Sequence, residues 1–434
     1  MESTVLLVLV LLALSHMVRP CNCAGPCSSA AYEFSGLSKD GAFHFPVFHR
    51  DHPCVDPSPP AVHAASVSDA GVVMGNDKIH KGKYFMGISL GTPTVFNLVT
   101  IDTGSTLSWV NSESCQMSCH DQAAEAGPKL DPRRSATYRQ TGCSDEACVD
   151  VHQDNGIPYG CIDETGTCLY SVRYGSQCSA GKLGRDRLAL GDNFTVVDDF
   201  TFGCSVDDMF YGLEAGVIGF GNKSYSFFNQ MVRQTSYSAF AYCFPSDHTA
   251  EGFMIIGPYP QRLELVTPLI RGYGRRCYVY SLLLLDMAVD GKRLQVDPTI
   301  DPRQILVVDS GTDDTFMSSP VFYALAEAVA SAMLNRGYYR EYGRDETACF
   351  RPASGEPVNW RGLPAVEMQF LRATLRLPPE NVFHQQSAGR ICLAFQPDTS
   401  GVRDVRILGN RALRSFRVVY DLQKMTFGFQ ARAC

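Results

Sequence analysis

Two short stretches of the sequence place an aspartate in the same local pattern. They are Ile101-Asp102-Thr103-Gly104-Ser105 and Val308-Asp309-Ser310-Gly311-Thr312, about two hundred residues apart. Each is followed by an apolar-apolar-Gly triplet, Val217-Ile218-Gly219 after the first and Ile407-Leu408-Gly409 after the second. A repeat of this length predicts two similar lobes that bring two carboxylates together across a pseudo-twofold axis.

Two carboxylates at one site can hydrolyse a peptide bond without a metal or a covalent intermediate. Because like charges so close together cannot both form easily, the pair shares one proton. The ionised member can activate a water while the protonated member donates to the carbonyl of the bond that is cut. The pair titrates as a unit, so no separate roles are assigned to Asp102 and Asp309. We expect both to be catalytic, supported by the active-site loop residues Thr103, Gly104, Ser105, Ser310, Gly311 and Thr312.

The alternative for each aspartate is an ordinary turn, the usual role of Asp beside Gly. One copy alone would not decide between the two, whereas the matched pair favours catalysis. Asp313 and Asp314 directly follow the second copy. We expect both to face solvent or to cap the next turn; a carboxylate facing the cleft would instead raise the pKa of the catalytic pair.

Length and charge limit the class of protein. The chain has 434 residues, enough for two domains, and a formal net charge of −7, which argues against a nucleic-acid partner. Five arginines near the end alternate with apolar residues, which predicts strands with one solvent-exposed side rather than a binding patch. They are Arg403, Arg406, Arg411, Arg414 and Arg417.

The beginning of the chain predicts export. The apolar run from Val5 to Leu14 is too short to cross a bilayer, which takes about 20 residues, and favours a signal peptide over 1–23 rather than a buried core segment. Residues 24–78 are rich in Pro, Ser, Ala and His and predict a removable prosegment, with a disordered linker as the alternative. An N-terminal β lobe over 79–257 and a C-terminal β lobe over 258–434 follow. We expect a secreted protein of the apoplast or the vacuole, with no membrane segment after signal cleavage.

The chain contains 17 cysteines, which suit an oxidising compartment where they form disulfides. Zinc is the alternative for Cys143, Cys148, Cys161 and Cys168, but structural zinc sites favour closer Cys-x2-Cys pairs. The sequons at Asn193 and Asn222 predict glycosylation. We expect no metal and no cofactor.

The elements that must position the two aspartates are mostly β-strands, with one or two helices per lobe. Pro320–Asn335 is the clearest helix, with a proline at its start and an apolar face of Val321, Leu325, Val329 and Met333. The predicted strands are Tyr84–Leu90, Phe96–Ile101, Leu169–Tyr174, Tyr278–Leu285, Ile305–Val308, Ala365–Phe370, Ile391–Phe395 and Phe416–Asp421.

From about Tyr84 to Cys434 the chain resembles pepsin-like aspartic peptidases, and most closely their plant nepenthesin-type branch. The motifs that carry the resemblance are Tyr84–Pro93, Asp102-Thr103-Gly104-Ser105 with Trp109, Phe202-Gly203-Cys204, and Ile407–Asn410 with the ending Phe416–Cys434. The resemblance implies a bilobal β fold with a central cleft. It also implies that Tyr174 is the flap tyrosine, which closes over bound peptide and hydrogen-bonds toward Trp109.

Family positions further imply the disulfides Cys119–Cys204, Cys143–Cys168, Cys148–Cys161, Cys243–Cys434 and Cys349–Cys392. Cys115, Cys178 and Cys277 are left without family partners. The flap departs from the family pattern Tyr-Gly-Asp-Gly-Ser, because here it reads Tyr174-Gly175-Ser176-Gln177-Cys178. The lost second glycine and the added thiol are expected to stiffen the flap tip or to change what it touches.

The resemblance favours a secreted aspartic endopeptidase that cleaves polypeptides at acid pH. Since one chain supplies both lobes, we expect a monomer whose partner is its polypeptide substrate. The alternative is a catalytically silent binding protein, such as an inhibitor of a glycosidase (xylanase). The two intact Asp-hydroxyl-Gly triplets favour the enzyme, whereas the altered flap favours the silent protein.

Overall fold

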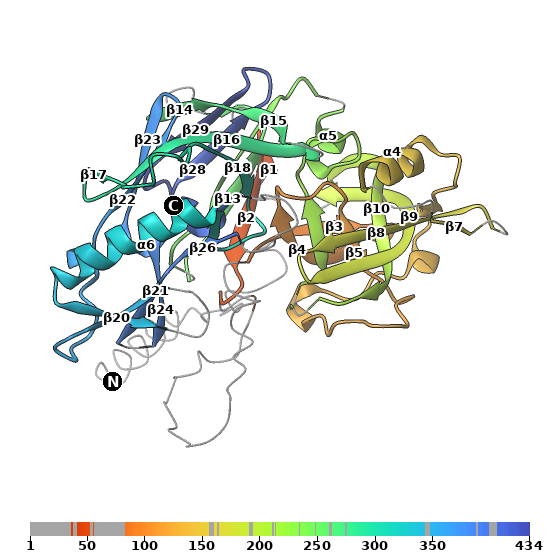
Figure 1. Cartoon of the computed structure of the whole chain (residues 1–434). Helices are drawn as coiled ribbons and strands as arrows, with labels where there is room; N and C mark the ends of the chain where they lie inside the picture. The colour runs from red at the N-terminus through yellow and green to blue at the C-terminus, as the bar shows by residue number, and fades with distance from the viewer. Residues whose placement is uncertain are drawn as a thin grey trace, which may run out of the picture.

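The computed structural model describes residues 36–37, 41–52, 55 and 83–434, apart from short gaps in the last range. The gaps are 156–159, 163–164, 191–193, 211, 213, 234, 248, 260–262, 274–275, 343–347, 388 and 399–405. The chain forms two β-rich lobes, one coloured orange to green and the other teal to blue in Figure 1. The predicted bilobal, mostly β architecture is therefore confirmed, while the signal peptide over 1–23 lies outside the described residues.

The N-terminal lobe is built on long strands that pair antiparallel around the first aspartate. Its longest pair, β9 with β10, extends along the outer part of the lobe and continues through β8 into the flap. Its elements are β3 (Tyr84–Leu90), β4 (Val95–Asp102), β5 (Trp109–Asn111), β6 (Arg139–Gln140), α4 (Glu146–Asn155), β7 (Cys161–Ile162), β8 (Thr167–Tyr174), β9 (Gln177–Leu190), β10 (Phe194–Asp208), β11 (Gly216–Gly219) and α5 (Phe227–Val232).

A central group of strands joins the lobes. In the described residues the strand order is β14-β29-β28-β12-β13-β2-β3, so the sheet combines segments from the beginning, the middle and the end of the chain. Its elements are β1 (Gly36–Leu37), β2 (Phe43–His49), β12 (Ala239–Cys243), β13 (Gly252–Ile256), β14 (Leu265–Pro268), β28 (Arg417–Asp421) and β29 (Thr426–Gln430).

Strand β2 comes from the predicted prosegment, yet it is part of this sheet. It pairs antiparallel with β13 over five residue pairs and with β3 over two. Phe45, Val47 and Phe48 are buried, and β2 stands between the two lobes in Figure 1. A prosegment over 24–78 stays a prediction, but seven of its residues form a strand of the sheet and five of these seven are buried.

The C-terminal lobe repeats the pattern around the second aspartate. One sheet has the order β23-β22-β16-β18-β27-β19-β26, and a smaller one has the order β20-β21-β25-β24. Its elements are β15 (Ile270–Tyr273), β16 (Arg276–Val289), β17 (Lys292–Arg293), β18 (Gln304–Asp309), β19 (Thr315–Met317), α6 (Ser319–Leu334), β20 (Tyr338–Tyr342), β21 (Ala348–Pro352), β22 (Val366–Phe370), β23 (Ala373–Leu377), α7 (Pro379–Val382), β24 (Phe383–Ser387), β25 (Arg390–Leu393), β26 (Phe395–Pro397) and β27 (Ile407–Gly409).

Helix α6 is the predicted helix, displaced by one residue at each end. A proline in its first turn suits the helix start, because the N–H that proline lacks has no partner there. Val321, Leu325, Val329 and Met333 are all buried, as the three- and four-residue spacing of the apolar residues predicts.

Five disulfides are present among the described cysteines, and three predicted pairings are wrong. Cys243–Cys434 and Cys349–Cys392 are present as expected. Cys148 and Cys168 are bonded, as are Cys143 and Cys161, because α4 holds Cys148 over strand β8, which carries Cys168.

The third error concerns Cys119, which bonds Cys115 four residues away instead of Cys204. Cys204 lies within β10, between β5 and β9, and its buried thiol contacts the Tyr138 hydroxyl at 3.9 Å. Cys115 therefore has a disulfide partner, although family positions leave it without one. Cys178 is a free, partly exposed thiol, and the side chain of Cys277 lies outside the described part of the chain.

Candidate active site

The two aspartates stand at equivalent ends of equivalent strands. Asp102 ends β4, which pairs in parallel with β11 so that Asp102 lies opposite Gly219. Asp309 ends β18, which pairs in parallel with β27 so that Asp309 lies opposite Gly409. The two apolar-apolar-Gly triplets of the sequence are thus the neighbouring strands that fix each aspartate.

The loops after the aspartates approach each other closely enough to require glycine. A Cβ on Gly104 would lie 2.6 Å from the Asp309 carboxyl carbon, and a Cβ on Gly311 would lie 2.8 Å from Asp102 Oδ1. Each carboxyl group therefore lies against the glycine of the opposite loop. The structure brings Asp102 and Asp309 together, as the repeat predicts.

Each carboxylate accepts two hydrogen bonds from its own loop. The Gly104 N–H donates to Asp102 Oδ1 at 2.8 Å and the Ser105 hydroxyl to Oδ2 at 2.5 Å. In the other loop the Gly311 N–H donates to Asp309 Oδ1 at 2.8 Å and the Thr312 hydroxyl to Oδ2 at 2.7 Å. These matched donors orient both carboxyl groups toward the same point.

The electrostatics of the pair favour one shared proton. Burial, followed by the negative charge of Asp309, raises the pKa of Asp102 to about 8. The two carboxyl groups are also hydrogen-bonded to each other, which requires a proton between them. Such a pair can hold a water between an ionised and a protonated oxygen.

Two hydroxyl side chains lock the lobes together beneath the carboxylates. The Thr103 hydroxyl donates to the Val308 carbonyl at 2.9 Å, and the Ser310 hydroxyl donates to the Ile101 carbonyl at 2.8 Å. Each hydroxyl also accepts from the backbone N–H of the other residue, at 2.9 and 3.0 Å. This reciprocal arrangement explains why a hydroxyl residue follows each aspartate.

The flap is the hairpin of β8 and β9. Tyr174 and Gln177 are its last paired residues, and Gly175 in the turn has a φ of 61°, a conformation that favours glycine. The Trp109 indole N–H donates to the Tyr174 hydroxyl at 3.0 Å, as the resemblance implies. Tyr174 also hydrogen-bonds Ser105, the donor to Asp102, so the flap tyrosine reaches the carboxylate pair through one hydroxyl.

Asp313 and Asp314 do not face solvent, so that expectation is wrong. Asp313 binds Arg411 at 2.7 Å and Arg414 at 2.9 Å, and both arginines are buried although the sequence predicts a solvent-exposed face. Asp314 accepts from the Gln396 side-chain amide at 3.2 Å. The signal that sequence analysis missed is the presence of opposite charges in the two loops that flank Asp309.

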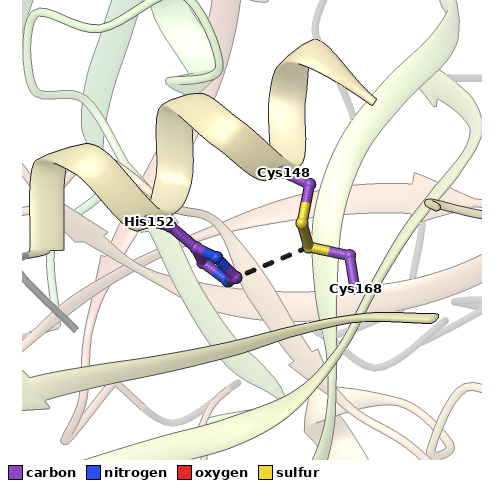
Figure 2. A group of neighbouring side chains, drawn as sticks. All are labelled: Cys148, His152 and Cys168. Carbon is purple, nitrogen blue, oxygen red and sulfur yellow. Dashed lines mark hydrogen bonds between the residues drawn. A yellow bond between two sulfur atoms is a disulfide. The ribbon is translucent and has the colours of Figure 1, made fainter. Parts of the chain in front are cut away.

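A second cluster of side chains with potential metal-binding atoms lies between α4 and β8. Figure 2 shows His152 beside the disulfide of Cys148 and Cys168, with its Nε2 4.0 Å from Cys168 Sγ. Their potential metal-binding atoms lie within 4.8 Å of one another. Both sulfurs are already bonded to each other and His152 Nε2 faces the Leu169 carbonyl at 2.7 Å, so this arrangement does not fit a metal.

The two predicted glycosylation sites are the sequons at Asn193 and Asn222. Asn193 lies outside the described residues, and Asn222 is partly exposed, so glycosylation stays a prediction. Among the described residues, no helix has the length and apolar character needed to cross a membrane.

Both halves of the chain match models of one protein family. Residues 84–258 match the model described as xylanase inhibitor N-terminal, and residues 279–431 match the model described as xylanase inhibitor C-terminal. Together the two matches cover most of the chain and divide it near the boundary between the lobes.

Individual proteins with similar sequences are named as aspartic proteases. The aspartic proteinase nepenthesin-1 of Nepenthes gracilis is 26% identical over 366 residues, covering 81% of this chain and 78% of that protein. The aspartyl protease family protein 2 of Arabidopsis thaliana is 29% identical over 368 residues, covering 81% of this chain and 71% of that protein. Among solved structures, the basic 7S globulin from soybean shares the fold, with a TM-score of 0.63 at 20% identity over 80% of this chain and 93% of that one.

Proposed function

The chain belongs to the pepsin-like aspartic protease family, and from that premise we propose that it is an aspartic endopeptidase that hydrolyses polypeptides at acid pH. The observation that carries this proposal is the intact pair of Asp102 and Asp309, each with both of its loop donors. A relative that does not hydrolyse peptides would not need these donors, whereas all four are present in this chain.

In the proposed reaction the water between the carboxyl groups attacks the scissile carbonyl. The ionised carboxylate accepts a proton from that water, and the protonated carboxyl donates its proton to the carbonyl oxygen. The amine nitrogen then takes a proton from the pair as the C–N bond breaks, and one hydroxyl of the tetrahedral intermediate returns a proton to the pair as the carbonyl re-forms, so the pair ends with one proton as it began. Tyr174 closes over the peptide and keeps bulk water from the site.

The pH dependence follows from the shared proton. Since the pKa of Asp102 is raised to about 8, the pair keeps one proton throughout the acid range. Activity is expected to fall at low pH when the second carboxyl becomes protonated, and to fall above neutrality when the shared proton is lost. An acidic working range agrees with a protein that acts in the apoplast or the vacuole, the localisation we propose.

The test is hydrolysis of a denatured protein from about pH 2 to 7, with and without pepstatin. Asp102→Asn and Asp309→Asn are each expected to lower activity by about 100- to 10,000-fold, the usual contribution of general acid–base groups. The matched control is Asp301→Asn, which changes an exposed aspartate paired with Arg303 and should leave activity unchanged. Full activity in either active-site variant would reject the proposed pair.

One observation favours a second function, a silent binding protein. Both halves match models described as those of a xylanase inhibitor, and the flap sequence departs from the family pattern. A xylanase inhibition assay on the same purified protein separates the two functions. Inhibition without peptide hydrolysis at any pH, after the segment before residue 79 has been cut, would establish the binding function instead.

A further inference from the structure

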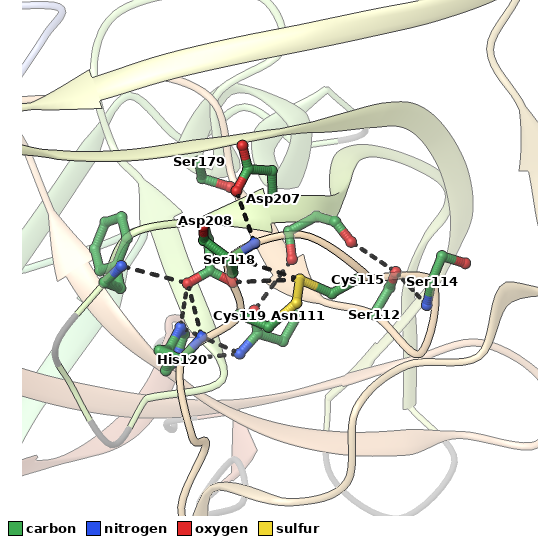
Figure 3. The surroundings of a disulfide bond; sticks show 12 residues. Asn111, Ser112, Ser114, Cys115, Ser118, Cys119, His120, Ser179, Asp207 and Asp208 are labelled. Atoms are coloured by element: carbon green, nitrogen blue, oxygen red, sulfur yellow. Dashed lines mark hydrogen bonds and ion pairs between the residues drawn. A yellow bond between two sulfur atoms is a disulfide. The ribbon is translucent and has the colours of Figure 1, made fainter.

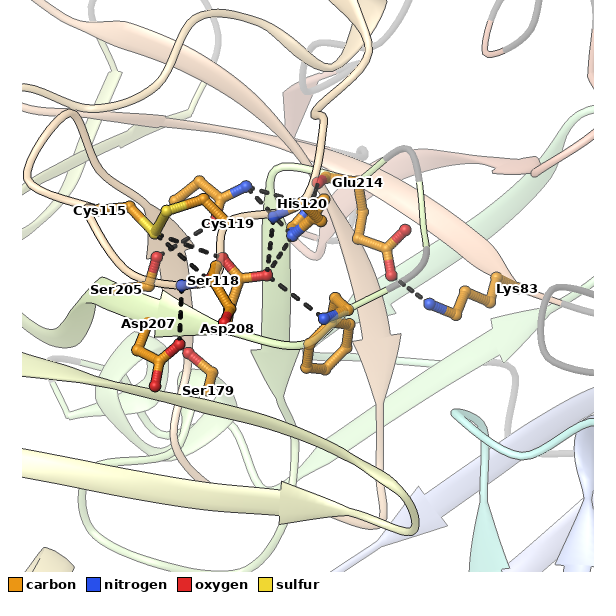
Figure 4. Close-up of polar contacts among 12 residues, drawn as sticks. Lys83, Cys115, Ser118, Cys119, His120, Ser179, Ser205, Asp207, Asp208 and Glu214 are labelled. Carbon is orange, nitrogen blue, oxygen red and sulfur yellow. Dashed lines mark hydrogen bonds and ion pairs between the residues drawn. A yellow bond between two sulfur atoms is a disulfide. The ribbon is translucent and has the colours of Figure 1, made fainter.

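A buried chain of polar groups lies behind the flap, outside the catalytic pair. Figure 4 shows it running from Lys83 to Glu214, then to His120 and Asp208. Lys83 Nζ contacts Glu214 Oε1, and His120 Nδ1 lies 2.5 Å from Asp208 Oδ1. The side chains of Glu214 and Asp208 are fully buried, and that of His120 is 3% exposed. Buried charges are costly unless paired, so this chain is an organised feature of the lobe.

Both ring nitrogens of His120 face acceptors. Nε2 lies 2.7 Å from the Glu214 carbonyl oxygen, which can only accept, so this nitrogen carries a hydrogen. Nδ1 faces the Asp208 carboxylate, which also accepts when it is ionised. The arrangement therefore fits an imidazolium. The remaining polar neighbour is the uncharged amide of Asn111, whose nitrogen lies 3.1 Å from Nε2.

The electrostatic balance agrees with this protonation state. Burial lowers the pKa of His120, but the hydrogen bonds to Asp208 and Glu214 and their two negative charges raise it above its usual value overall. Burial likewise raises the pKa of Glu214, but Lys83 lowers it overall. Between these two pKa values Glu214 is negatively charged and His120 is positively charged.

Asp208 links these buried polar side chains to the surrounding backbone by hydrogen bonds. Its Oδ1 also accepts from the backbone N–H groups of His120 and Phe210, both at 3.4 Å, and its own N–H donates to the Ser118 carbonyl at 2.6 Å. The disulfide of Cys115 and Cys119 closes the loop that carries Ser118, as Figure 3 shows. A change in the charge of His120 would therefore act on both sides of Phe210, at Asp208 and at Glu214.

Phe210 connects these buried polar side chains to the flap. Its ring is 5% exposed and lies 4.8 Å from the Trp109 ring and 5.3 Å from the Tyr174 ring, edge to face in both pairs. The His120 ring lies 6.2 Å from the same Phe210 ring, and Lys83 Nζ lies 5.3 Å from its centroid. Because aromatic pairs depend on geometry, a displaced Phe210 would release the flap tyrosine.

We propose that His120 is a positioning residue: bound as a cation between Asp208 and the Glu214 carbonyl, it holds Phe210 against Trp109 and Tyr174 and so keeps the flap placed over the carboxylate pair. The consequence for catalysis rests on the proposed peptidase function, whereas the contact with Trp109 does not. His120 touches neither substrate nor the reacting atoms.

The sign of the pH dependence follows from the charges. A histidine whose pKa is higher in the folded protein stabilises the fold fully below its unfolded pKa of about 6.5 and loses that contribution as the pH rises through its folded pKa. Glu214, whose pKa is lowered, stabilises the fold above about 4.5 and loses its contribution as the pH falls through its folded pKa. The contact of Phe210 with the flap is therefore held while His120 is protonated and is weakened as the pH rises through the pKa of His120, which lies above its usual value.

Tryptophan fluorescence tests the proposal without catalysis, because the chain has only two tryptophans. In the full-length Trp360→Phe variant, Trp109 alone reports on its contact with Phe210 and Tyr174. Its emission should show a His120 transition above pH 6.5 that adding His120→Gln removes, whereas a transition caused by loss of the proton shared by Asp102 and Asp309 should remain. The matched control adds His152→Gln, which changes a histidine of the same lobe that is equally buried at 7% exposure, and the transition should remain.

A further variant keeps the test decisive if His120→Gln does not fold. Phe210→Leu leaves the four polar residues in place but breaks the link, so His120 should still titrate by NMR while Trp109 no longer reports it.

At pH 5, His120→Gln should lower kcat/KM by about tenfold, as expected for a displaced positioning group. A pH profile of Trp109 emission that is unchanged by both His120→Gln and Phe210→Leu would overturn the proposal. Absence of hydrolysis in the parent protein with the transition intact would instead reject only the proposed function.

Discussion

Asp313 and Asp314 are adjacent carboxylates whose surroundings shift their pKa values in opposite directions. Burial raises the pKa of Asp313, but the charges of Arg414 and Arg411 lower it to about 2 overall. Burial and the charge of Asp313 raise the pKa of Asp314 to about 6. Only Asp313 is therefore ionised in the acid range in which we expect the enzyme to work.

Asp313→Asn is expected to destabilise the protein at pH 5, because it leaves Arg411 and Arg414 buried without their counter-charge. Removing one partner of a buried ion pair costs about 3–5 kcal/mol of unfolding free energy. In the wild type this contribution is present above about pH 4 and is lost as the pH falls through about 2. Urea unfolding at pH 5 and pH 2 measures the free energy of unfolding of the wild type and of the variant. The wild type should lose the contribution of Asp313 between the two pH values, whereas the variant lacks this contribution at both.

Asp314→Asn is the matched control one residue further along the chain. Since Asp314 is already protonated at pH 5, an amide should replace it at a cost of about 1 kcal/mol or less. Equal destabilisation by the two substitutions would contradict the assignment of charge to Asp313 alone.

Sequence patterns predict the residues at the centre of the site better than those around it. Asp102, Asp309 and their loops follow from a repeat that can be counted along the chain. Arg411 and Arg414 could not be assigned from their spacing, because a buried arginine and an exposed one look alike until its partner is placed in space. The same holds for His120, whose partners Asp208 and Glu214 lie 88 and 94 positions away.

Among the elements, the flap hairpin joins the catalytic pair to the body of the N-terminal lobe. Its tyrosine contacts Trp109 by a hydrogen bond and Phe210 by ring packing, so the two contributions can be separated.

Tyr174→Phe should keep the ring contact with Phe210 and lose the hydrogen bonds of the hydroxyl group to Trp109 and Ser105. A neutral hydrogen bond contributes about 1 kcal/mol, which corresponds to about fivefold in kcat/KM for each bond lost. Steady-state kinetics on a fluorogenic peptide at pH 4 measure the loss, and an unchanged melting temperature would show that the fold is intact. Unchanged kcat/KM would contradict a flap role for Tyr174.

Long elements with a clear apolar period can be predicted from the sequence. Short elements, and strands that pair with distant parts of the chain, cannot. The predicted strand Tyr84–Leu90 and the helix over 320–335 agree with β3 and α6 within one residue. Helix α4 carries a weaker apolar pattern and went unpredicted, and with it the correct partner of Cys148. The composition of residues 24–78, rich in Pro, Ser, Ala and His, predicts a removable segment, and it does not reveal β2 because its main partner β13 comes much later in the chain.

In the whole molecule, β2 is a structural strand of the central sheet, even when the polypeptide is cut after it. A cut between residue 52 and residue 83 would separate it covalently but not remove its pairing with β13 and β3. Burial of Phe45, Val47 and Phe48 stabilises its place by roughly 1.5–3 kcal/mol for each side chain.

The two pieces are therefore expected to stay together after such a cut at neutral pH. Native mass spectrometry should give the mass of both, while denaturing electrophoresis should separate them. An uncut sample taken through the same steps is the control. Release of the shorter piece under native conditions would show that another segment takes over its position.

The central sheet also sets an order of events during synthesis. Strand β12 has β28 as its neighbour, and Cys243 bonds the last residue of the chain, 191 positions later. While the ribosome is still making the second lobe, β12 presents an open edge with Phe240 and Tyr242 beside it. The central sheet cannot be completed before the final strands emerge, so a nascent chain stalled between β12 and β28 carries an edge prone to aggregation and a thiol without its partner.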